Sequence, residues 1–143
     1  MVRPYAGGVH SRAGEIQIDH MVPLKNAYVS GAWAWDYQRR CAYANFLGNS
    51  YHLIAVSGRE NMSKGDRTPA DWLPSNRGFV CTYLKAWLSV KLVWRLIMNP
   101  RESDAIKTAF REHGCDPKIF KLRQSELESQ RRIMLDSLAA CRP

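Results

Sequence analysis

Two stretches near the start of the chain are patterned as short strands. Residues 15–18 (Glu-Ile-Gln-Ile) alternate polar and apolar side chains, and a first strand with its exit is predicted over 15–24. After a Gly-Asn-Ser turn, the apolar and β-branched run 51–56 predicts a second strand. The Gly- and Pro-rich residues 1–14 predict an irregular arm or weak hairpin, with His10 as a solvated loop residue.

The remaining residues are patterned for helices. After a loop at Ser30-Gly31 the pattern becomes helical up to residue 46, and its aromatic residues near Trp35 are expected in the core rather than on a base-stacking surface, namely Trp33, Trp35 and Tyr37. Ser57 and Glu60 have the spacing of a capping box. A short helix is therefore predicted from about Gly58, ending at Gly65.

Capping signals divide the second half of the chain into further helices. The predicted segments are a short helix begun by Thr68-Pro69 and stopped by Pro74, an amphipathic helix over 79–97, a helix from Asn99-Pro100 to about Gly114, and a last helix from Asp116-Pro117 through Leu138. The order of elements predicts an α+β fold. We expect one domain over 1–143, with a core of about 15–75 and a mainly helical extension of about 76–143.

The charge of the chain indicates its class of partner more specifically than its composition does. The chain has 21 Lys and Arg against 13 Asp and Glu, and its net charge of +8 favours a polyanionic partner, either nucleic acid or an acidic membrane surface. The most hydrophobic window, 84–98, contains three basic residues and is too short to span a bilayer. We expect a soluble protein without a signal peptide in this sequence, either cytoplasmic or exported from a longer precursor.

The four cysteines are widely spaced and form no Cys-x-x-Cys pair, which argues against a four-cysteine zinc site. Isolated buried thiols are the default expectation for Cys41, Cys81, Cys115 and Cys141. If the protein is exported, a disulfide between helices is the alternative, with Cys81 and Cys115 as the expected pair.

The candidate chemistry lies in the first strand, where Asp19 and His20 are adjacent in an apolar run. Burial of two consecutive polar side chains requires that both are satisfied or used. If the strands pair and the short helix packs across them, Asp19, His20, His52 and Asn61 converge at one end of a ββα unit. A carboxylate and an amide oxygen suit Mg²⁺, which keeps most of its waters, and a histidine beside the metal can take a proton from water.

The ordered motifs resemble those of HNH-family endonucleases. They are DHMVPL (19–24), YAN (43–45), HLIAV (52–56), NMSKGD (61–66) and PADWLP (69–74). The sequence is most similar to the bacterial DHxVPL…NxSKGD…WLPP group, which is related to the C-terminal domain of GmrSD restriction enzymes. The resemblance covers about residues 15–94. The sequence departs from the pattern at Met62, where Arg is common, and at Ser75, where a second Pro is common.

The resemblance implies a ββα-metal (His-Me finger) core that cuts DNA, often with little sequence preference, and leaves a 3′-hydroxyl. It implies His20 as the general base and Asp19 and Asn61 as ligands of one divalent metal ion, with Mg²⁺ favoured and Mn²⁺ as the alternative. It further implies that His52 orients the base or supports the loop. Lys64 matches a basic residue that contacts the scissile strand.

Other basic residues are weaker candidates for contact with DNA. Arg39 and Arg40 lie off the apolar face of their predicted helix, and Arg67 follows the NMSKGD motif. The alternative function is a non-catalytic nucleic-acid-binding module on an HNH-like scaffold, and an inactive fold with a structural zinc is disfavoured by the cysteine spacing. Double-stranded DNA is the expected partner. The sequence does not decide between DNA and RNA as the substrate, and it does not give the cleavage specificity or the oligomeric state.

Overall fold

The computed structural model describes residues 3–9 and 12–142 of the chain. Two short strands, β1 (Ile16–His20) and β2 (Leu53–Ser57), pair antiparallel, with Ile16 opposite Ser57 and His20 opposite Leu53. The six α-helices of the described residues are α1 (Leu24–Val29), α2 (Tyr37–Ala44), α3 (Gly58–Lys64), α4 (Val80–Trp94), α5 (Pro100–Glu112) and α6 (Gln124–Ser137). The mixed α+β class expected from the sequence is confirmed.

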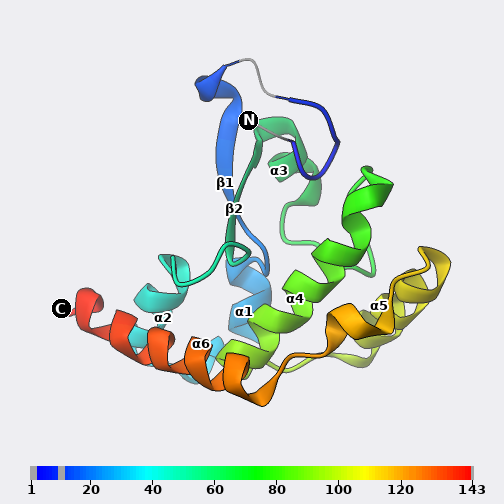
Figure 1. Cartoon of the computed structure of the whole chain (residues 1–143). Helices are drawn as coiled ribbons and strands as arrows, with labels where there is room; N and C mark the ends of the chain where they lie inside the picture. Colours follow the sequence, from blue (N-terminus) through cyan, green and yellow to red (C-terminus); the bar gives the residue numbers. More distant parts are fainter. Residues whose placement is uncertain (1–2, 10–11, 143) are drawn as a thin grey trace.

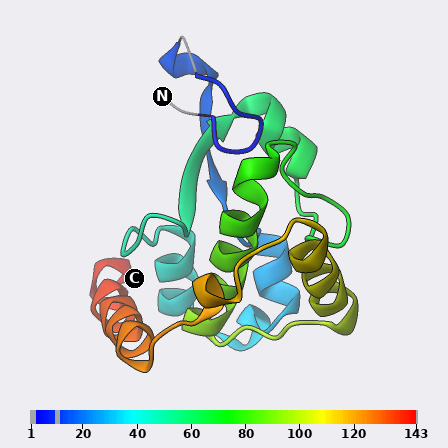
Figure 2. The ribbon, with the colours of Figure 1, turned by 45° about the vertical axis from the view of Figure 1, so that its right-hand side comes forward.

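Helix α4 is the central element of the core. It passes between the two-stranded sheet and the α5 helix, while α6 runs across the opposite end of the molecule from α3 (Figures 1 and 2). Its length is buried on several sides, and ten of its residues have almost no exposed surface, Tyr83, Trp87 and Trp94 among them. Such all-round burial is typical of a helix at the centre of a domain.

Helix α3 begins where the sequence predicts. The Ser57 hydroxyl accepts a hydrogen bond from the Glu60 backbone N–H at 3.2 Å, and the Glu60 carboxylate accepts one from the Ser57 N–H at 3.1 Å. The helix ends at Gly65, whose φ of 53° lies in the left-handed region that favours glycine. Since Ser57 also ends β2, the cap fixes the angle at which α3 leaves the two-stranded sheet.

Three helix predictions are corrected. Residues 68–72 form only a turn, in which the Thr68 carbonyl accepts from the backbone N–H groups of Asp71 and Trp72. The long helix stops at Trp94 because Arg95 takes a left-handed conformation, with φ of 55°. The last predicted helix is divided into a 3₁₀ turn at Pro117–Phe120 and α6.

The region between the strands also differs from its prediction. Pro23 ends the extended exit of β1 and caps a helix, α1, that the strand pattern did not predict. The predicted helix after Ser30-Gly31 is shorter and begins at Tyr37. Trp33 and Tyr37 are 61% and 66% exposed, so the expectation that they belong to the core is wrong. Trp35 alone among the three packs against the core.

All four cysteines are paired, so the default expectation of isolated thiols is wrong. The expected Cys81–Cys115 disulfide is confirmed, and a second disulfide joins Cys41 in α2 to Cys141 in the C-terminal 3₁₀ turn. The second bond closes a separation of 100 residues and fixes α2 to the end of the chain. No helix of the described residues is long and apolar enough to cross a membrane.

Candidate functional site

Strand β1 directs the side chains of Asp19 and His20 to different neighbours. Successive side chains of a strand point to opposite faces. Asp19 is 4% exposed and meets the end of α3, while His20 reaches the end of α2. The pair is thereby divided between two helices, and each member has its own surroundings.

The Asp19 carboxylate is held by two donors. Its Oδ2 accepts a hydrogen bond from the Tyr5 hydroxyl at 2.6 Å and one from the Lys64 ammonium at 2.8 Å. Both of these contacts within the described chain use the same oxygen, Oδ2. Oδ1 is therefore the carboxylate oxygen that has the capacity to take a further partner.

Lys64 is a fully buried cation at the last position of α3. Besides Asp19, its ammonium donates to the His20 carbonyl oxygen at 2.7 Å. Burial lowers the pKa of Lys64, and the charge of Asp19 opposes this effect. The Lys64 side chain has no exposed surface and joins α3 to β1. The contact with DNA that the resemblance implies for Lys64 stays a prediction.

Tyr5 is the site residue that the sequence reasoning missed. It lies in the arm predicted to be irregular, yet its ring is fully buried against Trp72, Phe79 and Tyr83. Burial and the adjacent charge of Asp19 raise the pKa of Tyr5, so the hydroxyl remains a neutral donor. An aromatic residue among Gly and Pro was the available signal, since such a side chain gains much free energy from burial.

His20 is oriented by the backbone of α2. Its Nε2 lies 2.9 Å from the carbonyl oxygen of Ala44. A carbonyl oxygen only accepts hydrogen bonds, so Nε2 carries the proton and Nδ1 has the basic lone pair. The ring is partly exposed, and Nδ1 is thus the nitrogen with which His20 can take a proton from a ligand or from water.

His52 lies next to His20 in the structure but in a different environment. It is 1% exposed, and its Nε2 lies 2.7 Å from the Tyr43 carbonyl oxygen, one residue before the carbonyl that orients His20. Its Nδ1 is buried without a hydrogen-bond partner in the described chain. Burial lowers the pKa of His52 to about 4, so the ring is neutral near pH 7. A buried, neutral ring held by a backbone carbonyl fits the second role that the resemblance implies for His52, which is support of the loop.

Asn61 is not hydrogen-bonded to Asp19 but to the neighbouring residue on the same face of β1. Its Nδ2 donates to Gln17 Oε1 at 3.0 Å. Residues 61 and 64 are three positions apart on α3, and residues 17 and 19 are two apart on β1, so each pair shares one face. With the amide nitrogen turned to Gln17, the Asn61 amide oxygen is the atom left for another partner.

The Gln17 side chain is itself positioned by a glycine. A Cβ added at Gly58 would lie 2.9 Å from Gln17 Nε2. A polar pocket of about 500 Å³ opens beside this contact, and the arginines Arg3 and Arg59 line it. The first residue of α3 therefore leaves room for the side chain that holds Asn61.

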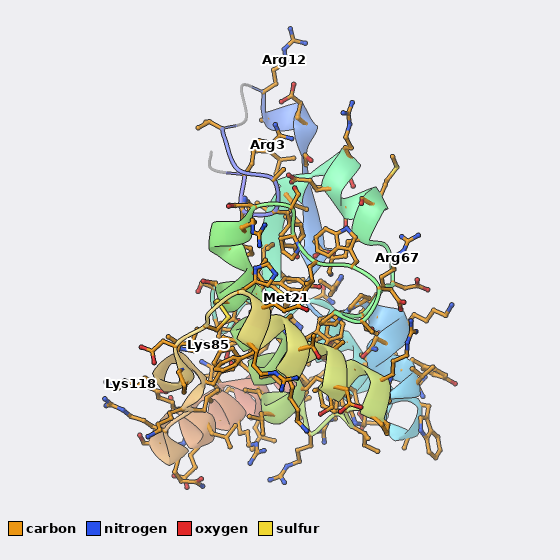
Figure 3. The ribbon with its side chains drawn as sticks, turned by 90° about the vertical axis from the view of Figure 1, so that its right-hand side faces the viewer. Arg3, Arg12, Met21, Arg67, Lys85 and Lys118 are labelled. Carbon is orange, nitrogen blue, oxygen red and sulfur yellow. A yellow bond between two sulfur atoms is a disulfide. The ribbon has the colours of Figure 1, made fainter. Side chains whose placement is uncertain are left out.

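The three other predicted arginines have different surroundings. Arg39 donates to the Trp94 carbonyl at 3.1 Å, and Arg40 donates to the carbonyls of Ala32 and Trp33, so both stabilise the local backbone. Arg67 is exposed and extends outwards on the side of the molecule that carries α1 and α3 (Figure 3). Arg40 and Arg67 therefore have surface available to a ligand, while Arg39 is half-buried.

The donor atoms were tested against the divalent metal that the sequence implies. No group of three or more His, Cys, Asp or Glu that could hold a metal occurs among residues 3–9 and 12–142. The oxygens with remaining capacity are Oδ1 of Asp19 on β1 and the amide oxygen of Asn61 on α3, two elements that the Lys64–Asp19 and Asn61–Gln17 hydrogen bonds join. One carboxylate and one amide suit a hard cation that retains several waters, so the donor chemistry fits Mg²⁺.

Comparison with known proteins gives the family. The profile of GmrSD restriction endonucleases, C-terminal domain, matches residues 5–108, from the buried Tyr5 into α5. This family is named for restriction endonucleases, a nuclease-related class. Within this class the chain belongs to the GmrSD C-terminal domain family.

A curated relative extends the comparison. An uncharacterized secreted protein of Arthroderma benhamiae is 41% identical over 103 residues, which make up 72% of this chain and 50% of that protein. The chain spans about half the length of this relative. No solved structure matches the chain significantly.

Proposed function

We propose that the protein is a metal-dependent endonuclease of the HNH type that hydrolyses phosphodiester bonds of DNA. The observation that carries the proposal is the hydrogen bond between His20 Nε2 and the Ala44 carbonyl, because it leaves Nδ1 as a base on a partly exposed ring. The family of restriction endonucleases supports DNA as the substrate. The net charge of +8 favours the same partner.

The two antiparallel strands and α3 form the frame of the proposed ββα-metal core. Asp19 on β1 and Asn61 on α3 would hold one divalent metal ion through their oxygens, with the Asn61 amide already turned by Gln17. When bound, such an ion supplies positive charge to the phosphate oxygens and the leaving oxygen. Lys64 and Tyr5 keep the Asp19 carboxylate in place.

His20 supplies the proton transfer of the proposed reaction. Its Nδ1 takes a proton from water, the water oxygen forms a bond to phosphorus, and the bond from phosphorus to the 3′-oxygen breaks. The 3′-oxygen leaves as a hydroxyl after protonation from solvent, and the phosphate remains on the 5′ side. Donation from Nε2 to Ala44 stabilises the positive charge that the ring gains.

The proposed compartment is an oxidising one. Two disulfides, Cys41–Cys141 and Cys81–Cys115, use all four cysteines, and bonds of this kind persist in exported proteins and are rare in the cytosol. The relative in Arthroderma benhamiae is described as secreted, which supports the same inference.

A second candidate function is a DNA-binding module without catalysis. The ion pair between Asp19 and Lys64 favours it, since an internal cation already neutralises the carboxylate that the metal requires. Under this alternative, Asp19 and Lys64 form a structural pair and His20 has no chemical task.

Nicking of supercoiled plasmid separates the two functions. The nuclease proposal predicts conversion to the open-circle form with Mg²⁺ or Mn²⁺ and no conversion in excess chelator. Asn61→Ala should abolish the activity or require more metal, with an unchanged circular dichroism spectrum, while Met62→Ala on the exposed side of the same helix should cut as the parent does. A protein that shifts DNA in a gel but does not nick it with any divalent metal would establish the binding module instead.

A further inference from the structure

A small pocket is lined by residues of α1, of α2 and of the segment between these helices. Helix α1 follows β1 at one end of the two-stranded sheet (Figure 1). Its volume is about 250 Å³. Ala27, Ala32 and Tyr43 line it with buried surface, while Leu24 and Tyr28 line it with side chains that are half exposed. The pocket therefore has an apolar floor and a rim that reaches solvent.

Aromatic rings and a guanidinium group face this pocket. Tyr28 and Trp35 contribute the rings, and Arg40 lies over the Tyr28 ring at 5.6 Å from its centroid. The Arg40 side chain is fixed by hydrogen bonds of 3.1 Å and 2.7 Å to the carbonyls of Ala32 and Trp33. A planar cation held in place beside exposed aromatic surface is the combination on which nucleobases stack.

The pocket adjoins the candidate base. Ala44 lines the pocket, and its carbonyl oxygen accepts the hydrogen bond from His20 Nε2. Tyr43, the preceding residue, lines the pocket and orients His52. A ligand in the pocket would therefore contact Ala44, the residue whose carbonyl holds the His20 ring.

Resting on the proposed nuclease function, the geometry points to a binding site for one unpaired nucleobase of a single-stranded DNA segment whose backbone passes His20. The volume is below the roughly 300 Å³ at which pockets begin to hold drug-sized ligands, so it admits one ring system. The Arg40 cation and the net charge of +8 complement a polyanionic strand. An apolar peptide side chain would use the floor of the pocket but would gain nothing from this charge.

Fluorescence anisotropy tests the inference by measuring how the full chain binds labelled strands of about 12 nucleotides, a length within the range that single-strand-binding domains cover. Excess chelator is present so that no strand is cut. The first probe is a single strand with ordinary bases. The second is the same strand with abasic sites at the central positions, and the third is the duplex. The wild-type protein should bind the ordinary strand about tenfold more tightly than the abasic strand, because stacking on aromatic residues contributes at this level.

Variants then assign the preference to the pocket. Tyr28→Ala should remove the tenfold preference, and Tyr28→Phe should retain it, because the phenyl ring still stacks. Tyr37→Ala is the matched control, since Tyr37 is a similarly exposed tyrosine of α2 that does not line the pocket. Tyr37→Ala should bind the ordinary strand with the same affinity as the wild-type protein does.

Equal affinity of the wild-type protein for the ordinary and abasic strands, or no binding of either, would overturn the inference and leave an apolar partner as the occupant of the pocket. Loss of the preference in Tyr37→Ala to the same degree as in Tyr28→Ala would also overturn it. The two proposals fail separately: plasmid nicking without base preference removes the pocket alone, and base preference without nicking in any metal removes the nuclease alone.

Discussion

The ammonium of Lys64 lies 2.8 Å from Asp19 Oδ2, and neither side chain exceeds 5% exposure. The two residues are 45 positions apart in the sequence, and their contact joins the end of α3 to the face of β1. The same ammonium donates to the His20 carbonyl, so one buried cation connects the helix to both members of the Asp19-His20 pair. The orientation of the candidate site therefore depends on an ion pair that solvent does not reach.

Removal of one partner of this ion pair should destabilise the fold. Lys64→Met leaves the Asp19 carboxylate buried without its cation, and we expect the free energy of unfolding to fall by about 3–5 kcal/mol in urea denaturation. The double variant Asp19→Asn/Lys64→Met should recover much of the loss because no charge is then stranded.

The exposed pair between Lys25 and Asp66 is the control for that measurement. Its groups lie 3.0 Å apart, but their side chains are 76% and 53% exposed. Lys25→Met should leave the free energy of unfolding unchanged, because solvent already screens the pair. An equal effect of Lys64→Met and Lys25→Met would show that burial of the Asp19 pair is not maintained in solution.

His52 should make the stability depend on pH. Its pKa is about 4 in the folded protein and about 6.5 in the unfolded chain, so the unfolded chain binds more protons between these values. Stability should therefore fall as the pH decreases from about 6.5 to 4, by up to about 3 kcal/mol from this residue. Urea midpoints at a series of pH values should show a flatter profile for His52→Asn, and a profile identical to that of the wild type would contradict the assignment.

The Cys41–Cys141 disulfide should matter for activity as well as for stability. It holds α2, whose Tyr43 and Ala44 carbonyls orient the two histidines. The double Cys→Ser variant at these positions should lose about 2–5 kcal/mol of stability and, under the proposed function, nicking activity per folded molecule.

The second disulfide provides the matched comparison. Cys81–Cys115 closes a separation of 34 residues between α4 and the residues after α5, away from the carbonyls of α2. Its double Cys→Ser variant should lose stability but keep its activity per folded molecule at low temperature. Equal losses of activity in the two variants would refute a positioning role for the first bond.

Gly58→Ala should change the metal concentration that nicking requires more than it changes the stability of the fold. Alanine at the first position of α3 suits a helix, but its Cβ would lie 2.9 Å from Gln17 Nε2 and would displace that flexible side chain. Asn61 then loses its partner, and nicking should require several-fold more metal. Gly14→Ala, whose Cβ meets nothing within 4 Å, should behave as the wild type. An unchanged metal requirement in Gly58→Ala would show that Gln17 does not position Asn61.

Local signals in the sequence predict the elements that depend on neighbouring residues. The Ser57–Glu60 capping box gives the start of α3, and the period of two gives β1, because both patterns act within a few residues. The turn at Thr68 shows the limit of such signals. Its cap and proline are typical of a helix start, yet only one turn forms before the chain packs Trp72 against Tyr5.

The candidate site was only partly predictable for the same reason. Asp19, His20 and Asn61 were identified by their residue types and by the resemblance of their motifs. Contacts across long separations decide what these residues touch: Lys64 reaches Asp19, and Asn61 reaches Gln17. Tyr5 has no periodic pattern around it, and its burial depends on aromatic residues that lie more than sixty positions away.

The plasmid-nicking rate of His20→Ala is the decisive measurement of whether His20 acts as the general base. With Mg²⁺ or Mn²⁺, we expect a loss of activity of at least about a hundredfold, the usual scale for removal of a general base, without a change in the circular dichroism spectrum. His113→Ala, at the end of α5, is the matched control and should cut as the wild type does. Nicking by His20→Ala at the wild-type rate would contradict the role of His20 as the general base.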